Sequence, residues 1–125
     1  MEQALIFDTE TTGLTLHPDA RLELQPRMIE FGGVLLSLLD GSIVEEISIL
    51  INPGCALPAE IVKITGITDD DLREAPTFVG ILPQIRRVFA EAAAVVAHNL
   101  PFDRAILRGE LLRAKVGNFP WPTRE

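Results

Sequence analysis

The dipeptide Asp40-Gly41 separates two long apolar runs, Met28–Leu39 and Ser42–Ile51. Asp-Gly flanked by apolar segments is a strong signal for a two-residue β-hairpin, because both central turn positions tolerate positive φ. The two runs therefore predict a pair of antiparallel strands. Gly32-Gly33 interrupts the first run and predicts a strand with either a bulge or a close approach of backbone.

Further segments alternate between strand and helix signals. The apolar run Gln3–Asp8 is short enough for a buried strand, and Ala92–Ala97 has the same character. Apolar residues at helical spacing predict an amphipathic helix over Thr77–Glu91, in which Pro83 should bend the helix or mark its true beginning. Shorter helices are expected at Ala59–Thr65, from the acidic stretch that Thr68 caps, and from Leu100-Pro101 onward.

On the last of these helices, the spacing predicts one apolar face, with charged residues on other faces. The predicted apolar face comprises Phe102, Ala105, Ile106, Gly109 and Leu112, whereas the residues predicted on other faces are Arg104, Arg108 and Glu110.

The order of these elements predicts an α/β fold with a mixed sheet. The 125 residues suffice for one domain, and 47% apolar with 23% charged residues is typical of a globular chain. We expect residues 1–117 to form the domain and residues 118–125 an extended tail. In such sheets ligands bind at the carboxyl ends of strands, where the strand order reverses.

Composition narrows the classes of function. A single cysteine, Cys55, excludes an internal disulfide framework and gives no zinc-binding spacing. No apolar stretch approaches the roughly 20 residues that cross a bilayer, so we expect a soluble, cytoplasmic protein without membrane contact. The net charge of −7 argues against non-specific coating of nucleic acid, which depends on Lys and Arg. It leaves open an enzyme that handles phosphates through bound metal.

Two carboxylates, Asp8 and Glu10, lie one residue apart where the first apolar run gives way to a glycine turn, and we expect the extended chain to continue over Gln3–Glu10. Because side chains alternate along a strand, both should project from one face. Such a pair repels unless a proton or a cation lies between its members, and its hard oxygens suit Mg²⁺ or Mn²⁺. Asp103, in the first turn of the last helix, can reach the same crevice. Its alternative role is a carboxylate favoured by the helix dipole.

The segment Phe7-Asp8-Thr9-Glu10-Thr11-Thr12-Gly13-Leu14, with His98-Asn99-Leu100-Pro101-Phe102-Asp103, resembles the first two motifs of the DEDD exonucleases, in particular the proofreading-subunit (DnaQ-like) type. The intervening Ile64-Thr65-Gly66-Ile67-Thr68-Asp69 also fits. The resemblance implies a ribonuclease-H-like mixed sheet flanked by helices. It also implies 3′–5′ release of nucleoside monophosphates from DNA, with RNA as the alternative, and a polymerase or a replication or repair assembly as partner.

The resemblance further implies that Asp8, Glu10 and Asp103 bind two Mg²⁺ or Mn²⁺ ions for phosphodiester hydrolysis. Substrate contacts are implied along both motifs and the central segment. Leu14 and Phe102 would meet the base and sugar of the terminal nucleotide, although either can belong to the core, and Thr12-Gly13 can simply form the turn. Many relatives have His at the position of Thr65. The implied substrate residues are Thr11, Thr12, Leu14, Glu60, Thr65, His98, Asn99 and Phe102.

The third motif of the family, which supplies a general-base His and a further Asp, has no counterpart after Asp103, because no Asp or His follows it. We therefore expect a C-terminally incomplete domain, as a fragment or a truncated gene product. His98 is expected to make a structural hydrogen bond rather than act as the base, and His17 is read as an exposed loop residue. Two alternatives stay open: an inactive module that binds metal and nucleotide, and an incomplete domain whose exposed sheet face promotes association.

Overall fold

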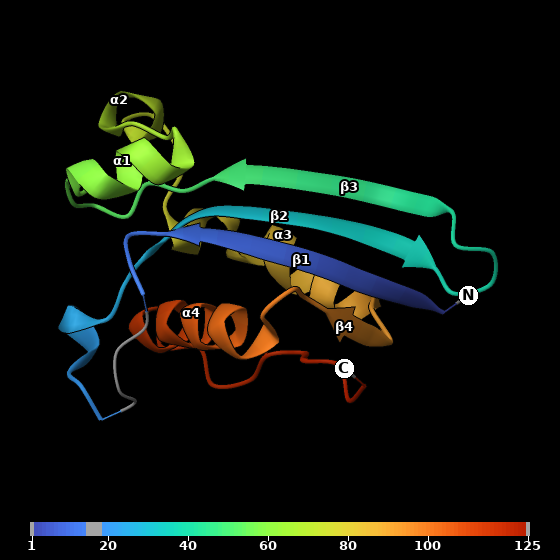
Figure 1. Cartoon of the computed structure of the whole chain (residues 1–125). Helices are drawn as coiled ribbons and strands as arrows, with labels where there is room; N and C mark the ends of the chain where they lie inside the picture. The colour runs from blue at the N-terminus through green and yellow to red at the C-terminus, as the bar shows by residue number, and fades with distance from the viewer. Residues whose placement is uncertain (1, 15–18, 125) are drawn as a thin grey trace.

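The computed structural model of the chain describes residues 2–14 and 19–124. Four strands form one sheet in the order β3-β2-β1-β4 (Figure 1). β1 pairs with β2 antiparallel and with β4 parallel, so the sheet is mixed, as the order of elements predicts. The strands are β1 (Gln3–Thr11), β2 (Met28–Ser37), β3 (Ile43–Leu50) and β4 (Ala94–Val96).

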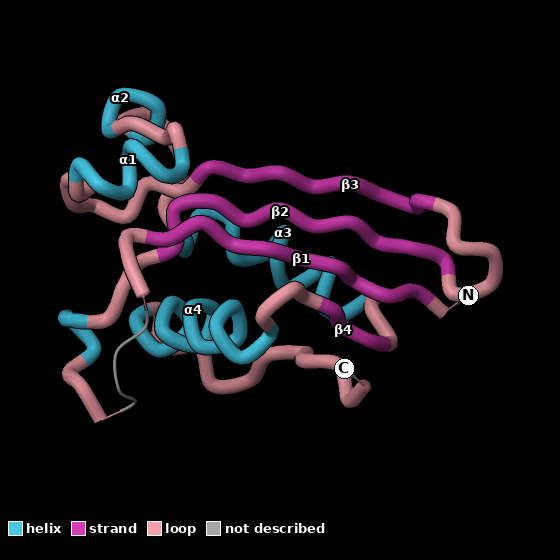
Figure 2. Tube along the Cα trace, viewed as in Figure 1, coloured by secondary structure: helices cyan, strands magenta, loops and turns pink. Residues whose placement is uncertain are grey.

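Along the chain, helical segments lie between the strands and after β4; Figure 2 draws them in cyan and the strands in magenta. Thr77 caps α3 by accepting a hydrogen bond from the Gly80 backbone, so the helix begins at Phe78 and Pro83 lies in its interior rather than at its start. The helical elements are η1 (Leu22–Leu24), α1 (Ala59–Thr65), α2 (Asp69–Leu72), α3 (Phe78–Glu91) and α4 (Leu100–Arg113). Across the described residues, no helix is both long enough and apolar enough to span a bilayer.

The β2–β3 connection departs from the predicted two-residue turn. β2 ends at Ser37 and β3 starts at Ile43, so residues 38–42 form the link. Local hydrogen bonds explain the longer turn: the Asp40 carboxylate accepts from the Ser42 N–H at 2.9 Å, and Gly41, at φ +76°, donates to the Ser37 carbonyl. These side-chain and backbone bonds compete with the tight turn that the dipeptide alone favours.

Gly33 is tightly packed, but by side chains rather than by the predicted close approach of backbone. A Cβ at this position would lie 3.2 Å from side-chain atoms of both Leu5 and Ile47, so a larger residue would force these side chains to shift by a few tenths of an ångström. The predicted alternative, a bulge at Gly32-Gly33, is wrong: the β2–β3 register shifts between Leu35 and Leu36 instead.

The main core lies between one face of the sheet and the helices α3 and α4. Alternate residues of β1 and β2 point into it, among them Leu5, Phe7 and Phe31, and all three are at most 2% exposed. The Phe7 ring meets the Phe89 ring of α3 edge-on at 5.2 Å. The face that Leu5 and Phe7 occupy is therefore the buried one, and the intervening residues of β1 point the other way.

A second, smaller cluster packs α1 and α2 against the end of the β2–β3 pair, through Ile29, Leu57, Ile67 and Leu72. Gly66 ends α1 in the left-handed conformation, and Thr68 and Asp71 form a reciprocal capping box on α2, as the sequence predicts for the cap. Figure 1 shows this unit beyond the end of β3.

The segment after residue 117 contains no helix, as expected of an extended stretch, but it packs against the domain. Phe119 and Trp121 contact the main core, and the Trp121 ring lies 5.3 Å from that of Phe89. The Arg124 carbonyl accepts a hydrogen bond from the Val95 N–H at 3.0 Å, which places this segment beside β4. Within the described residues, the packed unit therefore extends to Arg124.

Candidate active site

Asp8 and Glu10 share one face of β1, as strand alternation predicts. The buried residues Phe7 and Thr9 point to the opposite face, while Asp8 is exposed and Glu10 half-buried. Across the antiparallel pair, Gly32 of β2 stands opposite Asp8 and leaves the space beside its carboxylate open. Glu30 stands opposite Glu10, so a third carboxylate borders the pair.

Asp103 approaches the same strand from α4. Its side chain is 2% exposed. One of its oxygens, Oδ1, accepts hydrogen bonds from the Thr9 hydroxyl at 2.6 Å and from the Thr9 N–H at 3.2 Å. Asp103 is therefore attached to the residue that lies between Asp8 and Glu10.

The carboxylates interact electrostatically. The pKa of Glu10 is raised, chiefly by burial and then by the negative charges of Asp8, Glu30 and Asp103. The pKa of Asp103 is also raised: burial dominates and the charge of Asp8 adds to it, whereas the Thr9 hydrogen bonds act in the opposite direction. Both groups thus lie where negative charge accumulates, which is the environment that a cation relieves.

The donor set of this cluster fits Mg²⁺ or Mn²⁺. Asp8 and Glu10 supply hard oxygens from one face, and Mg²⁺ is commonly held by one or two carboxylates while it keeps several waters. Within residues 2–14 and 19–124, no three His, Cys, Asp or Glu side chains converge in a metal-binding arrangement. The structure thus provides a carboxylate pair with Asp103 beside it. Joint ligation by all three residues remains a prediction.

Thr11 and Thr12 build the turn after β1. The Thr11 hydroxyl donates to the Gly13 carbonyl at 2.6 Å, and the Thr12 hydroxyl accepts from the Arg27 N–H at 2.8 Å. Both hydroxyls are thus engaged within the chain. The predicted contact of Thr11 and Thr12 with substrate would therefore use the hydrogen bonds that each hydroxyl can still make, or other atoms on the surface of the turn.

Leu14 and Phe102, which the sequence leaves as core or substrate surface, differ in the structure. Leu14 is 82% exposed, so it contributes nothing to the core. Phe102 is half-buried and packs against the main core cluster. Leu14 therefore offers the larger free apolar surface of the two.

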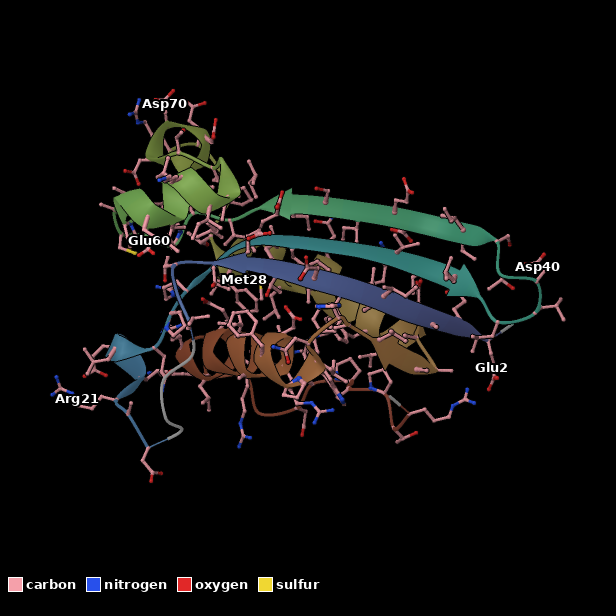
Figure 3. All side chains as sticks on the ribbon, in the orientation of Figure 1. Glu2, Arg21, Met28, Asp40, Glu60 and Asp70 are labelled. Atoms are coloured by element: carbon pink, nitrogen blue, oxygen red, sulfur yellow. The ribbon has the colours of Figure 1, made fainter. Side chains whose placement is uncertain are left out.

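Glu60 and Thr65 both belong to α1. Glu60 is exposed in the first turn of α1, at the same end of the sheet as Met28, where β2 begins (Figure 3). The Thr65 hydroxyl donates to the Ile61 carbonyl and accepts from the Ile67 N–H, at 2.8 and 3.1 Å. Thr65 therefore closes the end of α1, while the Glu60 side chain is accessible to solvent.

His98 and Asn99 form the exposed link between β4 and α4. The expected structural hydrogen bond of His98 is not found: among the described residues, its ring has no hydrogen-bond partner, although it lies near enough to Asp103 to lower the pKa of that carboxyl. Asn99 is the N-cap of α4 through its carbonyl, which accepts from the Phe102 and Asp103 N–H groups. His17 lies outside the described residues.

Two carboxylates near the site were not predicted. Glu30 follows an apolar pair within a strand, and only the β1–β2 register reveals that it faces Glu10. Glu110 was predicted only to lie off the apolar face of α4, and its burial was not foreseen: it is 1% exposed and paired with Arg27 and Arg113. The carboxylates of β1 lie on the open face of the sheet. Each of two cavities of about 370–380 Å³ in the described part lies elsewhere, beside Arg27 and beside Trp121.

Comparison with known proteins gives concordant matches. The family model described as "Exonuclease" matches residues 5–125. DNA polymerase III subunit epsilon of Treponema pallidum is 39% identical over 109 residues, which are 87% of this chain and 46% of that protein. DNA polymerase III PolC-type of Bacillus subtilis is 34% identical over 106 residues, or 85% of this chain and 7% of that protein. The chain thus spans less than half the length of these relatives.

Solved structures share the fold. The nuclease domain of 3′hExo, described as a DEDDh family member bound to rAMP, superposes with a TM-score of 0.73 at 19% identity, covering 93% of this chain and 61% of that one. Escherichia coli Exonuclease I in complex with a dT13 oligonucleotide gives a TM-score of 0.73 at 21% identity, covering 90% and 24%. At these identities the likeness concerns the arrangement of the sheet and helices, which is that of ribonuclease-H-like exonucleases.

Proposed function

The chain belongs to the exonuclease family, and we propose that it is a metal-dependent 3′–5′ exonuclease that releases nucleoside monophosphates from DNA ends. One observation carries the proposal. Asp8 and Glu10 share one open face of β1, and the buried Asp103, 94 positions from Thr9 in the sequence, binds that residue between them. The pKa of Glu10 is raised, by burial first and then by the negative charges of Asp8, Glu30 and Asp103, so a bound cation would stabilise this cluster, which suits a reaction on phosphate groups.

Asp8, Glu10 and Asp103 are the residues that would hold Mg²⁺ or Mn²⁺, which when bound supplies Lewis acidity and offsets the negative charge of a phosphodiester. The chain itself supplies the shape of the site. Gly32 leaves the surface beside Asp8 open, and Leu14, 82% exposed, offers an apolar surface for a terminal base or sugar. Glu60 is accessible on α1, at the same end of the sheet.

DNA is favoured as the substrate, with a polymerase or a replication or repair assembly as partner in the cytoplasm. The named relatives support this choice, since both are DNA polymerase III proteins, and a solved neighbour was crystallised with dT13. The net charge of −7 also supports tethering, because a chain with this charge has weak intrinsic attraction to a polyanion.

The decisive experiment incubates the 125-residue chain with a 5′-labelled single-stranded oligonucleotide and Mg²⁺ or Mn²⁺. We expect stepwise shortening from the 3′ end and release of nucleoside monophosphates, both abolished by Asp8→Asn and by Glu10→Gln. Glu46→Gln, which changes an exposed carboxylate on β3, is the matched control and should retain activity. The same oligonucleotide made of RNA should be shortened more slowly.

Equal cleavage by wild-type chain and by Asp8→Asn would overturn the proposal, because it would locate the activity outside this cluster. Absence of shortening with either cation would also overturn it for this chain. If calorimetry then showed metal-dependent binding of a nucleoside monophosphate without turnover, the inactive binding module would be the better description. Faster cleavage of RNA would overturn the preference for DNA alone.

A further inference from the structure

Glu110 is a buried carboxylate with a full set of partners. Its Oε2 and Oε1 accept from Nε and Nη2 of Arg27 at 2.9 and 3.0 Å, which is the bidentate geometry of a strong charge-assisted pair. It also accepts from the Met28 N–H at 2.9 Å and from Nη1 of Arg113 at 3.2 Å. One side chain of α4 thus anchors the beginning of β2.

Arg27 transmits this anchor to the turn after β1. Its N–H donates to the Thr12 hydroxyl at 2.8 Å, and its carbonyl accepts from the Thr12 N–H at 2.9 Å. Its Nη1 donates to the Pro53 carbonyl at 2.9 Å, which adds the loop before α1 to the same unit. The position of Thr12 relative to α4 is therefore set through the Arg27–Glu110 pair.

The same helix also attaches to β1 on the other side of the site. Asp103 lies seven residues before Glu110, about two helical turns, so both point to the same side of α4. Asp103 binds Thr9, and Glu110, through Arg27, holds Thr12. The end of β1 that carries Asp8 and Glu10 is thus held to α4 at two points.

A buried cluster of ion pairs is by itself weak evidence of a contribution to stability. Burying charges is costly, and replacing a buried ion pair with well-packed apolar residues is often neutral or stabilising. Arg113 adds a second cation whose pKa is lowered by burial, so the cluster carries a further desolvation cost. Hydrogen bonds that are directional, and that are kept despite the desolvation of their charged groups, are suited to holding the turn after β1 in a single conformation.

We propose that Glu110 is a positioning residue that fixes the turn of residues 11–14 for the 3′-terminal nucleotide. This inference rests on the proposed exonuclease function. Through Arg27, Glu110 sets the affinity of the chain for the nucleic-acid end. The hydrolysis step depends instead on the carboxylates of Asp103 and of the β1 residues. Loss of the pair should therefore raise KM and leave kcat nearly unchanged.

The test uses Glu110→Gln, which keeps the shape of the side chain but removes its charge and one acceptor. KM for a labelled oligonucleotide should rise by up to about tenfold, because weakening one charged hydrogen bond of Arg27 loosens the turn that it holds, with kcat changed less than about threefold. Glu45→Gln is the matched control: it weakens a glutamate–arginine pair with Arg87 at the surface and should leave both constants unchanged.

A second readout does not depend on turnover. Hydrogen–deuterium exchange of the Thr12 and Arg27 amides should accelerate in Glu110→Gln and not in Glu45→Gln. Arg27→Lys keeps the charge and the backbone bonds but cannot form the two-pronged contact, so it should show the same acceleration with a smaller loss of stability. This variant keeps the inference testable if Glu110→Gln fails to fold.

The two proposals fail separately. If wild-type chain cleaves no oligonucleotide, the exonuclease proposal fails, and the dissociation constant of a nucleoside monophosphate with Mn²⁺ replaces KM as the measure of affinity. The positioning role is overturned if Glu110→Gln melts at lower temperature but keeps wild-type exchange at Thr12. It is also overturned if kcat falls while KM is unchanged.

Discussion

The Thr9 hydroxyl donates a 2.6 Å hydrogen bond to Oδ1 of Asp103, and these two residues lie 94 positions apart in the chain. Thr9 points to the buried face of β1, away from its neighbours Asp8 and Glu10. The residue between Asp8, which is exposed, and Glu10, which is half-buried, therefore binds a third, buried carboxylate. This contact links the first motif of the sequence to the second.

Thr9→Val keeps the shape of the side chain and removes its donor. It should lower the free energy of unfolding by about 1–3 kcal/mol, since a buried carboxylate loses a partner. Mn²⁺ should also bind more weakly, because Asp103 is less well oriented. Urea denaturation and calorimetric Mn²⁺ titration measure the two effects. Thr9→Ser keeps the hydroxyl and should stay close to wild type; a stable Thr9→Val with normal metal affinity would contradict the role of this contact.

Asp103→Asn removes the charge of Asp103 while it keeps the shape and packing of the side chain. The amide oxygen can still accept from Thr9, so the fold should be retained. Nuclease activity should fall by about 100-fold or more, because a ligand charge worth several kcal/mol is lost. A single-turnover assay measures the fall, with circular dichroism as the check on folding. Activity within a few-fold of wild type would remove Asp103 from the site.

Glu10 should make stability depend on pH. Its pKa is raised in the folded chain, by burial first and then by neighbouring carboxylates, so the folded state binds its proton more tightly than the unfolded state. Stability from this group is therefore present at low pH and is lost as pH rises through the raised pKa. Glu10→Gln should melt at higher temperature than wild type near neutral pH.

That advantage should disappear below the ordinary value of 4.5, where Glu10 is protonated in both states, and Mg²⁺ should reduce it at neutral pH. Thermal melts of both proteins across this range test the sign. Glu46→Gln, at an exposed position of β3, should show no such dependence. A Glu10→Gln protein less stable than wild type near pH 7 would show that the carboxylate is not under electrostatic strain.

The sequence predicted the parts of the fold that depend on local patterns. α1 has the predicted bounds, and the mixed sheet follows from the order of elements. Alternation along β1 placed Asp8 and Glu10 on one face correctly. These inferences succeed because strand alternation and the glycine that ends α1 are properties of short segments.

The buried face of α4 was predicted only in part, and the reason is chemical. Ile106 is buried as expected, but Leu112 is 56% exposed, whereas Asp103 and Glu110 are buried. Hydrophobic periodicity assigns charged positions of a helix to its solvent face. It therefore misplaces two carboxylates that lie seven positions apart and are both buried. Their partners, Thr9 and Arg27, lie 94 and 83 positions away, so no local signal identifies the pairs.

Pro83 offers a test of the fold that is independent of activity. It was expected to bend α3 or to mark its beginning, and it lies in the interior of the helix, exposed, where it cannot donate a backbone hydrogen bond. Because proline in a helix interior costs about 3 kcal/mol relative to alanine, Pro83→Ala should stabilise the protein by up to about this amount.

Urea denaturation of Pro83→Ala should show a higher midpoint with an unchanged slope, since the surface that unfolding exposes is the same. Gln84→Ala, at the next exposed position of α3, is the control for general helix propensity and should change stability by only a few tenths of a kcal/mol. An unchanged or lower midpoint for Pro83→Ala would mean that the proline restricts the unfolded chain enough to offset its cost in the helix.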